Sequence, residues 1–398
     1  MIREAERLAR LPGYPLGEVP AIKRRLLEQG RDVIDLGAGD NDTPPPAPVV
    51  RALQQAVEDP ALSKYGFQQG LVEFRRATTR YMERRFGQRF DPMSEVLPLI
   101  GSKEGIAHLP FAVLDPGEPA IVPEPGYQAY LGGTLLAGGE PFVVRLEAAR
   151  DFLLELDELP APLLRRARVV FLNYPNNPTA ATAPMDYLER TVAACRRHDI
   201  VLAYDNAYCD LTFDGYVAPS IFQVAGAREV AIEYFSLSKS FSMTGWRLGW
   251  AAGSPGLIAA LTRVKTYTDT GPFLALQRAG VEALDHAETL VAPLRDELQR
   301  RRDAGVGALR DAGFRVTVPK GAMYLWVPLP PGIASEPFAR KALEDEAVVI
   351  LPGKALGAAG EGYFRAALTV PPARVREAIE RLGRVLERMR EEVVAQTA

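Results

Sequence analysis

Short apolar segments alternate with helix-like segments through the middle of the chain, and this alternation most strongly limits the folds open to it. Four segments have the length and apolar content of buried strands: 167–175, 200–205, 229–236 and 247–253. Between the first two, residues 185–199 place Leu188, Val192 and Cys195 on one face of a helix. Strands separated by helices predict an α/β fold with a mostly parallel, doubly wound sheet.

The pattern changes after about residue 285, which predicts a smaller second domain of α+β type. We expect a long charged helix at 294–313, strands at 314–319 and 322–329, and an amphipathic helix at 374–393. The predicted organisation is therefore an N-terminal arm, 1–44, that packs with the small domain, a large domain, 45–285, and a small C-terminal domain, 286–398.

Composition and charge exclude several classes of function. The 398 residues carry a formal net charge of -3, which gives no bulk attraction to nucleic acid or to an acidic membrane. No apolar run approaches the ~20 residues that span a bilayer, and the N-terminus lacks an apolar export signal. Cys195 and Cys209 form neither a metal-type spacing nor a disulfide framework, so we expect a cytoplasmic protein. The three histidines lack ligand spacing, and we expect no metal site.

Polar and charged residues follow several predicted strands at their carboxyl ends, where ligands bind in open α/β sheets. Asn177 follows the first strand, Asp205 ends the second with Tyr208 close behind, and Ser236, Ser238 and Lys239 follow the third. Each residue alone has an ordinary explanation: a solvated lysine, a helix cap, or an asparagine in a proline-rich turn. Their occurrence together at one sheet edge favours a site.

This set of residues matches the needs of pyridoxal 5′-phosphate. A partly enclosed lysine amine, Lys239, can form a Schiff base with the cofactor aldehyde. A carboxylate, Asp205, can hold the pyridine nitrogen protonated. Hydroxyls, helix N–H groups and an arginine bind phosphate, and Ser236, Ser238 and Arg247 provide them, as does the turn before the helix that we expect to begin near Ser102.

These segments carry a resemblance to a known family. SLSKSFSMTGWRLG resembles the lysine signature of class I/II aminotransferases, which are fold-type I pyridoxal-phosphate enzymes, and YPNNPT, YDNAYCDL, PGYQAY and GYFRAALT follow the family's usual order. The resemblance extends from Tyr14 to the last helix. GSKEGIAHLP, NYPNNPT and FDGY are most similar to the LL-diaminopimelate aminotransferase subfamily and its bacterial relatives.

The resemblance implies a role for each matching residue around the cofactor. Lys239 is the Schiff-base lysine and proton carrier, Asp205 bonds the pyridine nitrogen, and Tyr208 and Asn177 bond the 3-hydroxyl. Tyr127 stacks on the ring. The residues implied to hold the phosphate are Ser102, Lys103, Ser236, Ser238 and Arg247, with Tyr65 reaching the phosphate of a neighbouring subunit in a homodimer.

The resemblance also implies a substrate side. Arg365 takes the α-carboxylate of an amino acid, Gly39 brings backbone close to that carboxylate, Asn177 adjoins it, and Tyr14 lines the entrance. The implied reaction moves an amino group from an L-amino acid such as LL-diaminopimelate to a 2-oxo acid such as 2-oxoglutarate. Three departures from the family pattern, Asn41, Ala180 and Pro272, lie in loops and leave the identity of the substrate open.

Four other functions compete with this one. A general alanine- or aspartate-type transaminase and a β-lyase would keep the same cofactor residues. A ligand-sensing domain of a transcription regulator is disfavoured because no basic DNA-binding module precedes residue 30. A nicotinamide-binding protein is disfavoured because no G-x-G-x-x-G follows an early strand.

Overall fold

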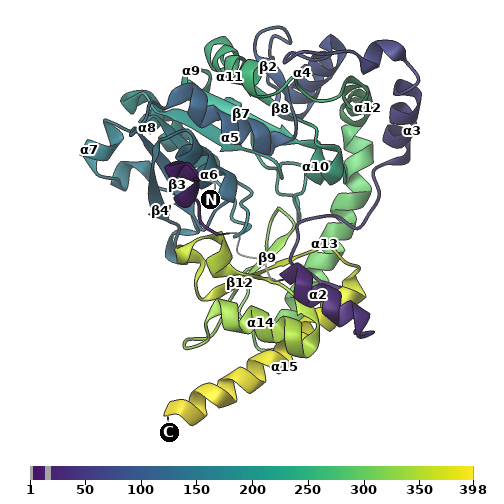
Figure 1. Cartoon of the computed structure of the whole chain (residues 1–398), viewed down its shortest axis with the longest axis vertical. Coiled ribbons are helices and arrows are strands. Elements are labelled where there is room, and N and C mark those ends of the chain that lie inside the picture. Colours follow the sequence, from purple (N-terminus) through teal and green to yellow (C-terminus); the bar gives the residue numbers. More distant parts are fainter. Residues whose placement is uncertain (1–2, 14–18, 398) are drawn as a thin grey trace.

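The computed structural model describes residues 3–13 and 19–397, and its largest feature is a seven-stranded sheet (Figure 1). The strands lie in the order β2 (Val96–Leu99), β8 (Gly249–Gly253), β7 (Ala231–Ser236), β6 (Val201–Asp205), β5 (Val169–Leu172), β3 (Pro119–Glu124) and β4 (Glu140–Arg145). Only β8 runs antiparallel to its neighbours β2 and β7. The predicted mostly parallel α/β sheet is confirmed.

Helices cover both faces of this sheet, as a doubly wound fold requires. One apolar cluster joins the sheet to α5 (Ser102–Val113), α6 (Gln128–Leu136) and α11 (Pro255–Thr268). Another cluster joins it to α4 (Val72–Phe86), α8 (Met185–His198) and α12 (Leu274–Asp285). Leu188, Val192 and Cys195 of α8 are all buried, as their helical spacing predicts. Short helices α7 (Ala161–Leu164) and α9 (Ala227–Val230) lie in the connections.

A smaller α+β region lies below the large sheet in Figure 1. Its antiparallel sheet has the order β11 (Leu351–Pro352), β12 (Tyr363–Ala367) and β9 (Tyr324–Pro328). Three helices accompany it: α13 (Ala287–Asp311), α14 (Ser335–Glu346) and α15 (Pro372–Thr397). The rings of Phe314, Phe338 and Phe364 pack against one another at its core.

The N-terminal residues contact both regions. Helix α1 (Glu6–Ala9) contacts α6 of the large region, whereas α2 (Val19–Glu28) and β1 (Ile34–Asp35) contact the smaller region. Helix α3 (Ala47–Ala56) follows and contacts α12. Strand β1 pairs in parallel with β10 (Val348–Val349), and Leu26 of α2 packs in one cluster with Leu343 and Val349. The domain boundaries at 44 and 285 stay a prediction. Among the described residues, no helix combines the length and the apolarity needed to cross a membrane.

The strand predicted at 314–319 is wrong. This segment is an irregular connection in the structure. The carbonyl of Pro319 pairs with a side chain and not with a neighbouring strand, since it accepts a hydrogen bond from Arg302 Nη1 at 3.0 Å. Phe314 is inserted into the aromatic core of the small region. The apolar content that predicted a strand therefore reflects core packing.

Candidate active site

A pocket of about 660 Å³ lies where the carboxyl ends of the large sheet face the small region. It collects residues from both ends of the chain, because the loop at 37–40 and strand β12 both reach it. Its lining includes every predicted site residue except Tyr65 and Tyr14: Gly39, Ser102, Lys103, Tyr127, Asn177, Asp205, Tyr208, Ser236, Ser238, Lys239, Arg247 and Arg365. A pocket of this size can hold a cofactor or a small ligand.

Lys239 enters the pocket from a short helical turn, α10 (Leu237–Ser240), directly after β7. The Ser236 side chain caps this turn by accepting from Ser238 N–H at 3.2 Å. On the other side, Ser240 Oγ donates to Asp210 Oδ2 at 2.8 Å, and Asp210 also accepts from the buried Tyr81 hydroxyl. Lys239 Nζ donates to the carbonyl of Gly39. The lysine is thus held from both sides and is partly buried.

Asp205 ends β6 and is buried at the pocket wall. Burial raises the pKa of its carboxyl to about 6, while hydrogen bonds from Tyr130 and from the Ala207 backbone limit that rise. Tyr130 OH donates to Asp205 Oδ2 at 2.8 Å. Asp205 Oδ1 is buried but has no hydrogen-bond partner among the described residues. A ligand that offers a cationic N–H would satisfy this oxygen and favour the ionised carboxylate.

Tyr208 meets a residue that the sequence analysis did not select. Its hydroxyl lies 2.9 Å from the hydroxyl of Tyr324 on β9, and burial raises the pKa of Tyr208 well above its ordinary value. Gly39 lies against the same tyrosine, since a Cβ atom at Gly39 would collide with the Tyr324 hydroxyl. In the sequence, Tyr324 belongs to the apolar strand predicted at 322–329. Nothing in the local sequence distinguishes it from a core tyrosine.

The residues predicted to bind phosphate gather around the start of α5. Gly101 precedes this helix with a φ of 70°, and its missing side chain leaves room for Arg247, whose guanidinium a Cβ atom would strike. Arg247 donates to Thr244 O at 2.8 Å and to Ser238 Oγ at 3.4 Å. The unpaired N–H groups of a helix N-terminus attract anions. We call this group of residues the phosphate cup: Ser102, Lys103, Ser236, Ser238 and Arg247, at the start of α5. The cup combines an arginine, hydroxyls and helix N–H groups, as a phosphate requires.

Arg365 reaches the pocket from β12 and is buried. Its Nη1 donates to Asn177 Oδ1 at 2.8 Å and its Nη2 donates to Gly37 O at 2.6 Å. The guanidinium carbon lies 4.3 Å from the centre of the Tyr324 ring, and Nε has no hydrogen-bond partner among the described residues. A planar guanidinium in this setting suits a carboxylate, which can accept two parallel N–H bonds.

Tyr127 and Lys103 form one further wall of the pocket. Lys103 Nζ lies 5.8 Å from the centre of the Tyr127 ring, and Tyr127 packs edge-on against Tyr130. Burial raises the pKa of the Tyr127 phenol. Tyr65 lies away from the pocket and is 76% exposed, stacked on Phe67. Tyr14 lies outside the described residues, so its predicted role stays a prediction.

The three departures have defined surroundings. Asn41 Nδ2 donates to Lys239 O at 3.3 Å and to Ser242 Oγ at 3.4 Å, which ties its loop to the lysine turn. Ala180 adopts a φ of 57°, a conformation that favours glycine, three residues after Asn177. The carbonyl of Pro272 accepts from Gln277 Nε2 at 2.8 Å in a loop away from the pocket lining.

These observations fit pyridoxal 5′-phosphate. The unpartnered, buried Asp205 Oδ1 matches a pyridinium N–H, and the cup around Gly101 and Arg247 matches a phosphate. Lys239 supplies an amine in the same pocket, which Tyr208 also lines. The residues present therefore provide each type of contact that this cofactor needs.

Comparisons with known proteins agree with this geometry. Residues 31–382 match the family model described as aminotransferase class I and II. The chain is 46% identical to the LL-diaminopimelate aminotransferase of Desulforudis audaxviator, over 97% of this chain and 98% of that protein. It is also 36% identical to the solved structure titled probable N-succinyldiaminopimelate aminotransferase from Thermus thermophilus, with a TM-score of 0.88 over 92% of this chain and 99% of that one.

A third similarity concerns the apo structure of BacF from Bacillus subtilis, which is 30% identical, with a TM-score of 0.93 over 97% of this chain and 98% of that chain. The predicted family, fold type and cofactor are thereby confirmed. The enzyme uses an amino acid and a 2-oxo acid as substrates, and the chain belongs to the class I and II aminotransferases, which depend on pyridoxal 5′-phosphate.

Proposed function

We propose that this aminotransferase takes its amino group from LL-diaminopimelate, passes it to 2-oxoglutarate, and acts as a homodimer. The observation that carries the proposal is the single pocket in which Lys239, Asp205 and Arg365 meet. The similarity to proteins named LL-diaminopimelate aminotransferase supports this donor. We also propose a cytoplasmic location, because Cys195 and Cys209 are both buried free thiols.

We assign the cofactor contacts to the residues of the sheet edge. When bound, pyridoxal 5′-phosphate supplies an electron sink for the reacting carbon. Asp205 would hold the pyridine nitrogen protonated, Tyr208 and Asn177 would bond the 3-oxygen, and Tyr127 would lie beside the ring. The phosphate would be held by the residues of the cup: Ser102, Lys103, Ser236, Ser238 and Arg247.

Lys239 Nζ is the proposed acid–base group. It lies in the pocket on a turn that is fixed by Ser236 on one side and by Asp210 on the other. A fixed amine can remove the proton from the substrate α-carbon and later return a proton, provided that it stays within hydrogen-bond reach.

Arg365 is proposed to bind the α-carboxylate of the substrate. In the structure its two terminal nitrogens donate to Asn177 Oδ1 and to Gly37 O, so its donors already point in fixed directions. A substrate carboxylate would replace at least one neutral acceptor with a charged one, and charge-assisted pairs of this kind are the stronger ones. Gly39 has no side chain, which lets the backbone lie directly against Tyr324 beside this arginine.

The choice of donor is tested by a panel of amino acids with 2-oxoglutarate as acceptor. We expect LL-diaminopimelate to have the highest kcat/KM, above alanine, aspartate and glutamate. Good turnover of alanine or aspartate without any turnover of LL-diaminopimelate would instead favour a general transaminase. Keto acid released in the absence of any amino acceptor would favour a β-lyase.

Exposed aromatic side chains on two segments, at residues 65–67 and 267–273, support the homodimer. Tyr65, Phe67 and Phe273 are exposed, and Tyr267 is 91% exposed. Gln277 joins two of these segments by bonding Leu71 N–H and Pro272 O. Exposed apolar groups gathered in this way are typical of protein interfaces. We propose that Tyr65 reaches the phosphate bound by the partner subunit.

Hybrid dimers test this arrangement. A Tyr65→Ala protein and a Lys239→Ala protein should each have little activity, and mixing them should restore part of it. Restoration requires one intact site that combines residues from two subunits. A fully active monomer in sedimentation experiments would contradict the proposed dimer.

A further inference from the structure

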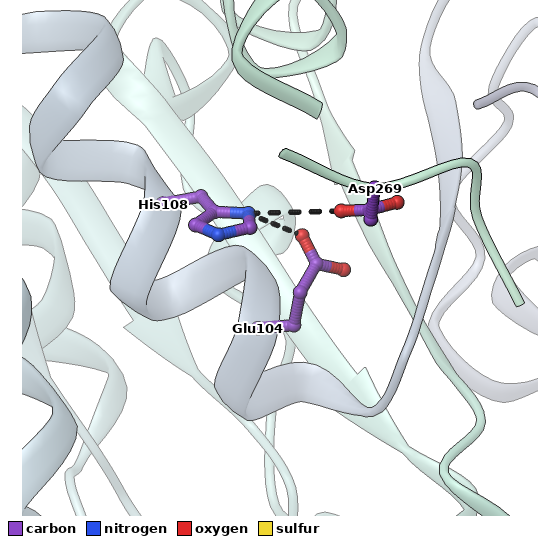
Figure 2. A group of neighbouring side chains, drawn as sticks. All are labelled: Glu104, His108 and Asp269. Atoms are coloured by element: carbon purple, nitrogen blue, oxygen red, sulfur yellow. Dashed lines mark hydrogen bonds and ion pairs between the residues drawn. The ribbon is translucent and has the colours of Figure 1, made fainter. Parts of the chain in front are cut away.

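A group of polar and charged side chains around one buried lysine lies next to the phosphate cup and outside the pocket lining. Glu104 and His108 belong to α5, Lys265 belongs to α11, and Asp269 follows α11. Figure 2 shows Glu104 and His108 on one helix, pointing toward Asp269 on a separate segment. His108 Nδ1 lies 2.7 Å from Glu104 Oε1 and 3.9 Å from Asp269 Oδ2. None of the four residues lines the pocket.

Lys265 is the cation of this group. Its side chain is 0% exposed, and Nζ lies 2.7 Å from Glu104 Oε2 and 3.0 Å from Asp269 Oδ1. A buried ammonium is costly unless it is paired, so both carboxylates are needed to hold it. Although Glu104, His108 and Asp269 could supply metal ligands, the Lys265 ammonium already lies within salt-bridge distance of both carboxylates. We therefore assign no metal to this cluster.

Glu104 connects the cluster to the phosphate cup. Its Oε2 accepts the N–H of Ile100 at 3.1 Å, so one carboxylate ties the residue before Gly101 to the first turn of α5. Ser102 and Lys103 lie between these two points. Burial alone would raise the pKa of Glu104, but His108 and Lys265 lower it below its ordinary value, which keeps the carboxylate ionised. The shape of the turn that presents the phosphate donors thus depends on this carboxylate.

Asp269 connects the same cluster to the proposed dimer interface. Its Oδ1 accepts the N–H of Gly271 at 2.7 Å. Gly271 has a φ of 83° and lies against the segment of Tyr65, because a Cβ atom there would lie 2.6 Å from Phe67 O. A continuous series of contacts therefore runs from the phosphate turn, through Lys265, to the segment that carries Tyr65.

We propose that Glu104, Lys265 and Asp269 form a positioning unit that fixes the phosphate-binding turn at 100–104 relative to the interface loop at 269–273. Through this unit, binding of the cofactor phosphate and association of the subunits favour each other. The coupling between cofactor binding and subunit association depends on the proposed homodimer. The fixing of the phosphate-binding turn depends only on contacts within one subunit, so the two parts of the proposal can be tested separately.

The first experiment compares two cofactor forms on apoprotein. Glu104→Gln and Lys265→Met should each raise the dissociation constant of pyridoxal 5′-phosphate by about tenfold or more, as expected when a hydrogen bond to a charged group is lost. Binding of pyridoxal, which lacks the phosphate, should change little. The double variant should lose about as much affinity as either single variant, because the residues act together.

A control comes from another ion pair, in which only the arginine is buried. Arg302 is buried, and Asp214, with which it pairs, lies outside the pocket lining. Asp214→Asn should lower the melting temperature without changing the affinity for pyridoxal 5′-phosphate. Equal loss of pyridoxal and pyridoxal 5′-phosphate binding in Glu104→Gln, or unchanged binding of both, would overturn the positioning role.

The second experiment measures subunit association by sedimentation with and without pyridoxal 5′-phosphate. In the unmodified protein the cofactor should tighten the dimer, and in Asp269→Asn this effect should shrink toward none. An equally strong cofactor effect in Asp269→Asn would overturn the link to the interface. A chain that is monomeric in both states would overturn both this link and the proposed dimer, whereas the comparison of the two cofactor forms would still decide the role of the turn.

Discussion

The two walls of the pocket are built in different ways. One wall consists of the strand ends of the large sheet, where Asp205, Ser236 and Lys239 follow directly from β6 and β7. The other wall consists of the loop at 37–40 with β9 and β12, and its contacts join residues far apart in the sequence. Arg365 and Gly37, for example, are 328 positions apart.

This difference separates cofactor chemistry from substrate recognition. The sheet wall takes its residues from neighbouring strand ends, and it carries the groups proposed to act on the cofactor. The second wall combines paired strands with the loop at 37–40, and side-chain hydrogen bonds tie that loop to the pocket: Lys239 and Arg365 donate to its carbonyls, those of Gly39 and Gly37. Changes in the sheet wall should therefore abolish the reaction, whereas changes in the second wall should alter which substrates react.

The largest effect is expected for Lys239→Ala. Loss of the amine should reduce turnover by about 10⁴-fold or more, because acid–base catalysis and covalent attachment of the cofactor are lost together. The unmodified protein should be yellow and should carry a cofactor that borohydride fixes to Lys239. Lys103→Ala is the control for the borohydride experiment, because Lys103 lines the same pocket but the cofactor should still be fixed to Lys239 in this variant. A cofactor fixed to another lysine would show that the assignment is wrong.

Asp205→Asn should come next. An amide cannot hold the pyridine nitrogen protonated, so kcat should fall by about 10²–10³-fold while the cofactor remains bound. Tyr130→Phe keeps the carboxylate but removes its 2.8 Å donor, and it should have a smaller effect. The measurement is kcat together with cofactor content by absorbance. Near-normal turnover of Asp205→Asn would contradict the proposed role.

Much of the sheet wall could be predicted from the sequence because its signals are local. Asp205 and Lys239 each end or follow an apolar strand, and the strand-end rule places them together. Tyr324 could not be predicted in this way, since its contact with Tyr208 joins positions 116 apart. The strand expected at 314–319 was wrong for a related reason: the apolar character of Phe314 serves the core of the small region. The contact between Glu104 and Lys265 could not be predicted either, because only the fold brings α5 and α11 together.

On the second wall, Arg365→Lys should lower kcat/KM for amino acid donors by the equivalent of about 2–4 kcal/mol, because a lysine cannot replace a bidentate pair. Simple amines without a carboxylate should be nearly unaffected. Steady-state kinetics with matched donors, one with and one without the carboxylate, measures this difference. Full activity of the variant on every amino acid would remove Arg365 from the substrate site.

Tyr324→Phe should have a smaller effect. The ring would still lie beside Arg365, but the hydrogen bond to Tyr208 would be lost, at a cost of about 1 kcal/mol in kcat/KM. Tyr324→Leu should cost more for donors that carry a carboxylate, because the ring contact with the guanidinium is lost as well. If the two variants had the same kcat/KM with every donor, Tyr324 would have no part in positioning Arg365.

The smallest effect is expected at Ala180, where the chain departs from the family pattern close to Asn177. A glycine would relieve the left-handed conformation, worth about 1–2 kcal/mol, but would lose a buried methyl group and add freedom to the unfolded chain. The free energy of unfolding should therefore stay within about 1 kcal/mol of its original value. Ala347→Gly is the matched control, because Ala347 has a φ of 54° and lies outside the pocket lining. Neither variant should change the ratio of kcat/KM between LL-diaminopimelate and alanine. A changed ratio in Ala180→Gly alone would mean that the loop after Asn177 belongs to the substrate wall, and the division between the two walls would have to be redrawn there.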